Sequence, residues 1–80
     1  MRYEVRIVSS ARKHGVSRAR IKQALDSQTF SETLPVLGKD PKIAFRGHDE
    51  RGVELEIVAV VLPNQLLVIH AMPTYFRRSI

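Results

Sequence analysis

Hydrophobic and polar residues alternate at both ends of the chain, which is typical of strands with one buried face. Residues 2–8 show this two-residue period, and the period returns after Pro41. The later region predicts three further strands separated by two short turns. These strands are expected at residues 42–48, 53–62 and 66–71, with turns at 49–52 and 63–65. The run over 53–62 is the longest and most apolar, so we expect it at the centre of a sheet.

Between the first strand and Pro41, the spacing of apolar residues changes to that of a helix. Ile21, Ala24 and Leu25 stand three and four positions apart, as on one face of a helix. Ser17 precedes them at the position where a hydroxyl caps the free amides of a first turn. The pattern therefore predicts a helix from residue 18 to about residue 26.

Two shorter segments complete the expected order of elements. Residues 11–14 are predicted to form a helical turn that Gly15 ends. Residues 27–41 contain two prolines and a glycine and are expected to form a loop, with one short extended piece at 34–37. The order of strand, two helices and consecutive antiparallel strands predicts an α+β two-layer sandwich. Both short helices would pack on one face of a three- to four-stranded, mostly antiparallel sheet. Without a linker, residues 1–80 are expected to form a single domain.

The charge of the chain is positive and unevenly distributed. Thirteen basic residues against eight acidic ones give a net charge of +5. Residues 1–24 contain seven basic residues and one acidic residue, and Arg77 and Arg78 add two more at the other end. This asymmetry predicts a polyanionic partner, most simply a nucleic acid.

Several other classes of protein are disfavoured by composition. The chain has no cysteine, and its three histidines are scattered, so neither a metal site nor a cofactor is expected. The longest apolar run, 57–62, is far shorter than the ~20 residues that span a bilayer. Charged residues occupy the start of the chain, where a signal peptide would be apolar. We therefore expect a cytoplasmic protein that does not bind a membrane.

Two stretches carry a resemblance to a known family. Residues 10–17 read Ser-Ala-Arg-Lys-His-Gly-Val-Ser before a helix, and residues 68–78 read Val-Ile-His-Ala-Met-Pro-Thr-Tyr-Phe-Arg-Arg. The first resembles the Lys-His-Gly segment of the BrnT family, and the second resembles the closing strand and basic tail of the same family. The resemblance implies a RelE-like fold and a toxin of a type II toxin–antitoxin pair. It also implies cleavage of RNA, free or on the ribosome, and an acidic antitoxin protein as partner.

Cleavage of RNA without a metal needs a base, an acid and cations that stabilise the charged phosphorane. Histidine suits the first two roles because its reference pKa is about 6.5. Arginine suits the third because its planar guanidinium grips phosphate through two hydrogen bonds. The predicted catalytic residues are His14, His70 and Arg46, with either histidine as the base. The predicted phosphate-binding residues are Arg12, Lys13, Arg77 and Arg78.

The positions of these residues along the predicted elements add detail. Regular alternation places His70 on the same face of its strand as Leu66 and Val68. His48 is expected at the solvated end of a hairpin. Glu56, with a second carboxylate two residues before it, is expected to offset neighbouring arginines.

Two other functions fit the same residues. Residues 15–25 are similar to part of a helix-turn-helix, which would bind DNA. A non-catalytic module could instead use the basic surface to bind an acidic protein or a nucleic acid. The ribonuclease is the interpretation that uses the histidines as well as the charge.

Overall fold

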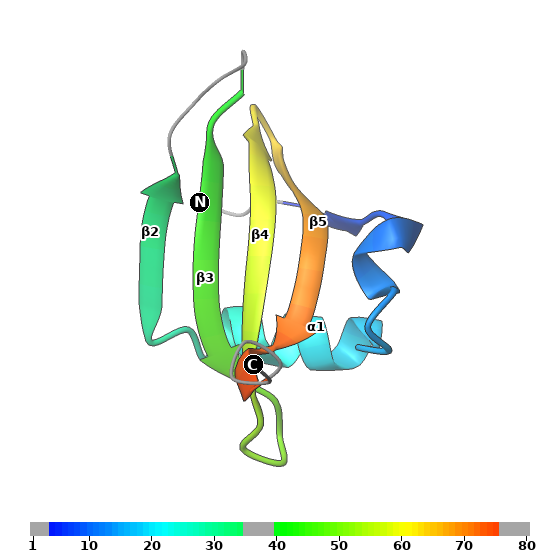
Figure 1. Cartoon of the computed structure of the whole chain (residues 1–80). Helices are drawn as coiled ribbons and strands as arrows, with labels where there is room; N and C mark the ends of the chain where they lie inside the picture. Colours follow the sequence, from blue (N-terminus) through cyan, green and yellow to red (C-terminus); the bar gives the residue numbers. More distant parts are fainter. Residues whose placement is uncertain (1–3, 35–39, 76–80) are drawn as a thin grey trace.

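The computed structural model describes residues 4–34 and 40–75, in which five strands form one open, mixed sheet (Figure 1). The elements are β1 (Glu4–Ile7), the 3₁₀ turn η1 (Ser9–Arg12), α1 (Arg18–Asp26), β2 (Phe30–Leu34), β3 (Lys42–His48), β4 (Glu54–Leu62) and β5 (Gln65–Pro73). The strand order is β1-β5-β4-β3-β2. Neighbouring strands are antiparallel except for β1, which runs parallel to β5. The predicted α+β class is confirmed, and β4, which contains the long apolar run, is central as expected, although β5 also has nine residues.

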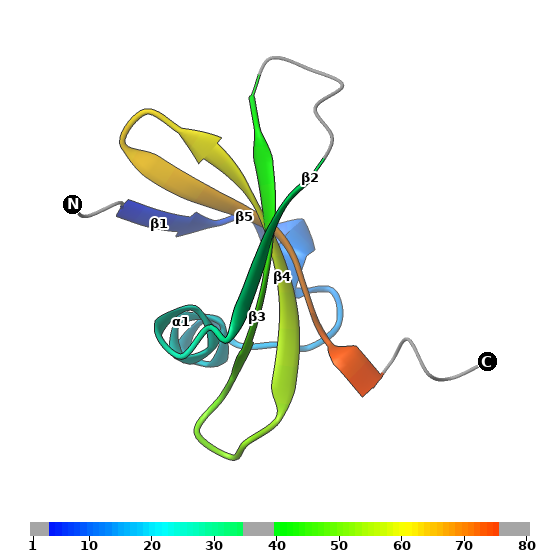
Figure 2. The same ribbon diagram turned by 90° about the vertical axis from the view of Figure 1, so that its left-hand side faces the viewer.

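The helix α1 forms where the sequence predicts it and covers one face of the sheet (Figure 2). The Ser17 hydroxyl accepts a hydrogen bond from the amide of Arg20 at 3.2 Å, which confirms the predicted cap. Ile21 and Ala24 are buried between α1 and the sheet. The helix packs against β3 and β4, so the opposite face of the sheet, which we call the distal face, faces away from α1.

The prediction of two helices on one face is wrong, because the first is a single 3₁₀ turn against β5. The turn spans four residues, too few for an α-helix to repeat its hydrogen bonds. Gly15 then turns the chain with a φ of +79° and donates its amide to the carbonyl of Arg12 at 2.9 Å. α1 is the one α-helix among residues 4–34 and 40–75, so these residues do not form a helix-turn-helix.

The expected sheet of three to four strands has a fifth, because β2 lies inside the predicted loop at 27–41. This strand pairs with β3 at the edge of the sheet, and all its residues but Leu34 are exposed. An edge strand with no buried face has no alternation to mark it in the sequence. The expected extended piece at 34–37 lies outside the described residues after its first position, and so do residues 2–3 of the first strand.

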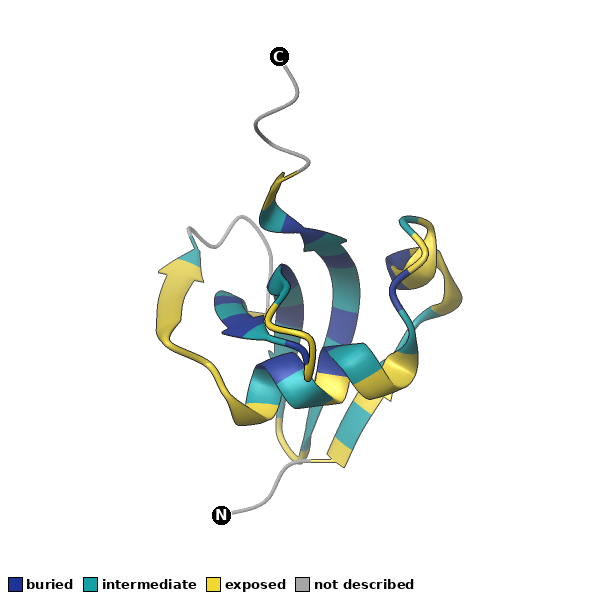
Figure 3. Ribbon diagram, turned by 90° about the horizontal axis from the view of Figure 1, so that it is seen from below, coloured by how far each residue is buried: buried dark blue, intermediate teal, exposed yellow. Residues whose placement is uncertain are grey.

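The hydrophobic core lies between α1 and the middle of the sheet. Leu55, Ile57 and Ala59 of β4 are fully buried there. In Figure 3 the buried positions gather on α1 and on the strands behind it, whereas β2 is exposed along most of its length. Gly47 allows the backbones of β3 and α1 to approach closely. A Cβ at this position would overlap the carbonyl group of Ala24 in α1.

A β-bulge in β5 changes the direction of His70. The β4–β5 register pairs Val58 with His70 and Ala59 with Val68, which leaves Ile69 as an extra residue. Val68 and the residue after His70, Ala71, are both fully buried in the core. His70 therefore points to the distal face. The expectation that it shares a face with Leu66 and Val68 is wrong, because alternation cannot be counted through a bulge.

Candidate functional site

His14 and His70 lie side by side although they are almost at opposite ends of the chain. Their ring centroids are 5.8 Å apart, and the rings meet edge to face at 77°. His14 follows η1, which packs against β5, and His70 belongs to β5 beyond the segment that pairs with β1. Because β1 pairs with the first half of β5, the chain that follows it passes the second half. The parallel pairing thus brings the two predicted histidines together.

Glu56 of β4 adds a carboxylate to this pair. Its Oε2 lies 3.6 Å from Nε2 of His70, and its side chain is only 9% exposed. Carboxylates are rarely buried unless they face a cation or hydrogen-bond donors. The three side chains form what we call the His–Glu cluster: His14, His70 and Glu56.

Arg46 of β3 is also on the distal face. It stands directly opposite Glu56 in the β3–β4 register. On its other side it faces Phe30 of β2, and its Cζ lies 5.4 Å from the centroid of that ring. Adjacent strands are about 4.8 Å apart, so Arg46 starts about 10 Å from β5. A shallow hollow of about 130 Å³ lies beside these residues, over β2, β3 and β4.

For the other predicted phosphate ligands, no contact with the His–Glu cluster is described. Arg12 and Lys13 are exposed immediately before His14. Tyr75, at the end of the described chain, is 57% exposed. Arg77 and Arg78 lie outside the described residues.

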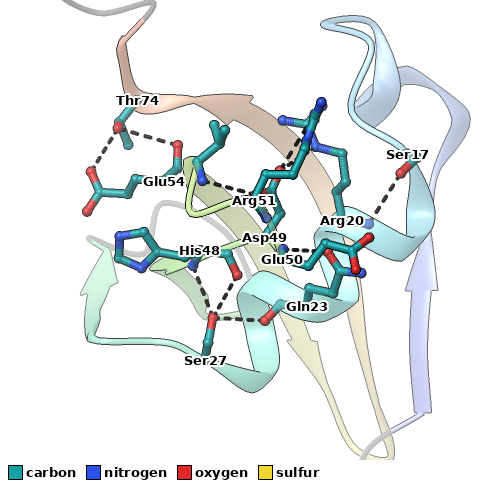
Figure 4. A network of polar contacts seen from close by, with 11 residues as sticks. Ser17, Arg20, Gln23, Ser27, His48, Asp49, Glu50, Arg51, Glu54 and Thr74 are labelled. Carbon is teal, nitrogen blue, oxygen red and sulfur yellow. Dashed lines mark hydrogen bonds and ion pairs between the residues drawn. The ribbon is translucent and has the colours of Figure 1, made fainter.

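A separate polar network is centred on Asp49, at the turn between β3 and β4 (Figure 4). Its buried carboxylate accepts hydrogen bonds from Nε of Arg20 at 2.8 Å and from the amides of Arg51 and Val53 at 2.9 and 3.0 Å. Burial alone would raise the pKa of this carboxylate. The three hydrogen bonds outweigh burial, so the pKa of Asp49 lies below its ordinary value. The network ties the hairpin to α1 and is structural.

Two residues near this turn also have structural contacts. The backbone of His48 is held by Ser27, whose hydroxyl donates to the His48 carbonyl at 2.8 Å and accepts from its amide at 3.0 Å (Figure 4). Glu54 accepts a hydrogen bond from the hydroxyl of Thr74 at 2.7 Å. His48 shares the distal face with Arg46 but is at the end of β3, as expected for a hairpin.

Two residues of these sites, Asp49 and Phe30, were not singled out by the sequence, and Glu56 was expected only to offset the charge of neighbouring arginines. Glu56 interrupts an apolar strand between Leu55 and Ile57, and a carboxylate in that position signals a buried partner. Asp49 begins a turn that ends at Gly52, the pattern of an aspartate that accepts amides two and four residues later. Phe30 gave no signal, because it lies on an edge strand.

No protein-family model, no curated protein and no solved structure matches this chain. Within the part of the chain that the structure describes, no helix is long and apolar enough to cross a membrane. In the same part, no three histidine, aspartate or glutamate side chains are arranged to hold a metal ion.

Proposed function

We propose that this protein is a metal-independent endoribonuclease of the toxin class, with a RelE-like fold of the BrnT type. The observation that supports it is the His–Glu cluster: two histidines edge to face, one of them beside a buried carboxylate. Two imidazoles within reach of one phosphate are what acid–base cleavage of RNA needs. An acidic antitoxin protein, as the resemblance implies, would be the partner that blocks this site.

The reaction begins at the ribose 2′-hydroxyl. His14 acts as the neutral base and takes the hydroxyl proton as the oxygen attacks phosphorus. His70 acts as the acid, with the carboxylate of Glu56 3.6 Å from its Nε2 to orient the ring. A bond forms between O2′ and phosphorus, the bond from phosphorus to O5′ breaks, and His70 gives its proton to O5′. The products are a 2′,3′-cyclic phosphate and a 5′-hydroxyl.

Arg46 supplies the positive charge in this proposal. Its guanidinium reaches the distal face between Phe30 and Glu56 and would hold a non-bridging phosphate oxygen. Removal of one such donor from a transition state typically costs about 10²- to 10³-fold in rate. Arg12 and Lys13 would contact neighbouring phosphates from the side of His14.

The test uses inducible expression in bacteria together with cleavage of RNA by the purified protein. We expect the wild type to stop growth and to cleave RNA in the presence of EDTA. His14→Ala and His70→Ala each lower the cleavage rate by about 10²-fold or more. Glu56→Gln lowers it less than His70→Ala does.

His48→Ala is the matched control, because this third histidine also lies on the distal face but is held through its backbone. It is expected to cleave at the wild-type rate. A wild-type protein that leaves both free RNA and ribosome-bound mRNA intact would refute the proposal. Binding of RNA without cleavage would instead identify a non-catalytic module.

A further inference from the structure

A groove runs between the outer edge of β1 and the helix α1, on the side of the molecule away from Arg46. Its larger part, of about 480 Å³, is lined by Glu4 and Val5 and by the second half of α1. Its smaller part, of about 210 Å³, continues along β1 to Ile7 and to Arg18. Val5 and Lys22 line both parts, so the two hollows form one continuous groove.

One wall of this groove is a strand edge with open backbone groups. β1 is the last strand of the described sheet and pairs only with β5. The amides of Glu4 and Val8 donate to Asn64 and Val68, toward β5. Backbone groups of a strand alternate in direction, so the amides and carbonyls of Val5 and Ile7 point outward, into the groove. Such an edge is a template for a further strand.

The charges along the groove differ between its two ends. Arg6, Arg18 and Lys22 make the end near Ile7 basic. Glu4 and Asp26 make the other end acidic. Within residues 4–34 and 40–75, none of these five side chains forms an ion pair. They are therefore available to a partner.

We infer that this groove binds an extended peptide segment, which adds to the sheet as a sixth strand beside β1. The segment would carry acidic side chains at the end near Arg18 and a basic side chain at the end near Asp26. In the antiparallel sense, which pairs slightly more stably, its acidic end is N-terminal. A nucleic acid fits less well, because its phosphates are uniformly negative and Glu4 and Asp26 would repel one end.

This inference is independent of the proposed ribonuclease activity, which uses the distal face. The open backbone groups supply affinity through hydrogen bonds along the strand, and the charges at the two ends set the direction of the peptide. The groove thus has both features of strand addition: an unpaired edge and complementary charge.

The probe is a blocked eight-residue peptide of alternating threonine and valine, with two glutamates near its N-terminus and one lysine near its C-terminus. Amide hydrogen exchange by NMR gives a local readout. In the free protein the amides of Val5 and Ile7 should exchange fast and that of Arg6 slowly. With peptide, Val5 and Ile7 become protected at least about tenfold, whereas Arg6 changes little.

Two variants test the wall and the charges separately. Arg18→Glu with Lys22→Glu should weaken binding at least about tenfold, and the matched double variant Lys13→Glu with Lys42→Glu, at two exposed lysines outside the groove, should not. Val5→Pro removes one outward amide that β5 does not use, so binding should fall. Because the Val5 side chain also packs against the core, circular dichroism of the variant checks that the fold is kept.

Four results would overturn the inference. Equal binding of a peptide with glutamine and threonine in place of its charges would remove the charge argument. Protection at β2 instead of β1 would place the peptide at the other edge of the sheet. Protection of Val5 and Ile7 by an eight-nucleotide uridine oligomer but not by the peptide would make a nucleic acid the occupant. Dimerisation of the protein alone that Val5→Pro abolishes would make a second copy of the chain the occupant.

Discussion

At the scale of single residues, the carboxylate of Asp49 accepts three hydrogen bonds that join separate parts of the described chain. One carboxylate joins α1, through Arg20, to two amides of the β3–β4 turn. Removal of a buried charged acceptor leaves its donors without partners, which is more costly than the net value of the hydrogen bonds. The turn and the helix therefore depend on each other through this side chain.

The hydrogen bonds of the Asp49 carboxylate predict how the stability of the protein responds to acid. The pKa of Asp49 is lower in the folded protein than in the unfolded chain, where it is about 3.9. Its contribution to stability is therefore complete above about pH 4 and is lost as the pH falls through the folded value. Asp49→Asn should lower the urea midpoint at pH 7. It should also flatten the loss of stability between pH 4 and pH 2, measured by circular dichroism. An unchanged slope in the variant would contradict this role.

The histidines show what residue type can and cannot predict. His14 and His70 were candidates because imidazole is the side chain suited to acid–base chemistry near neutral pH. Residue type alone does not bring them into contact, because the contact depends on the pairing of the first strand with the last, β1 with β5. Glu56 was underestimated for the same reason, since its partner comes from another strand.

At the scale of elements, the docking of α1 on β3 depends on one glycine. Gly47 has no side chain, and a Cβ there would overlap the backbone of Ala24. Neither partner is the flexible end of a side chain, so the helix itself would have to move. Gly52 differs, because space around it is open and only its φ of +81° disfavours a side chain.

These two glycines give a matched pair of substitutions. Gly47→Ala should destabilise the protein by about 2 to 3 kcal/mol, as overpacking of a core does. Gly52→Ala should cost about 1 kcal/mol, the strain of a left-handed alanine. Urea unfolding of both variants measures the difference. If Gly47→Ala lowers the free energy of unfolding no more than Gly52→Ala does, the close packing of α1 on β3 does not limit the side chain at position 47.

Element boundaries could be predicted where the sequence has a strong period. The helix α1 and the strand β3 have buried faces whose spacing appears directly in the residues, and β4 and β5 are apolar runs bounded by turns. β2 could not be predicted, because its exposed residues follow no period. The bulge at Ile69 could not be predicted either. It changes which face of the sheet the later residues of β5 point to, but no residue type marks it in the sequence.

At the scale of the whole molecule, the net charge of +5 predicts that RNA binding weakens with salt. Each phosphate contact on a single strand contributes about −0.7 to the slope of log K against log salt. With a 2′-O-methyl RNA, which cannot be cleaved, Arg46→Ala should make this slope less negative by about 0.7. Arg51→Ala, at the tip of a hairpin, should leave it unchanged. A wild-type affinity that is insensitive to salt would contradict a phosphate-binding surface.

The pH dependence of RNA cleavage by the purified protein in EDTA tests the proposed pair of histidines most directly. With His14 as a neutral base and His70 as a protonated acid, the single-turnover rate should be bell-shaped in pH, and the product should end in a 2′,3′-cyclic phosphate. His14→Ala should remove the rise on the acidic side, whereas His70→Ala should remove the fall on the basic side. A rate that both variants retain at the wild-type level, or a wild type that does not cleave RNA, would contradict the account.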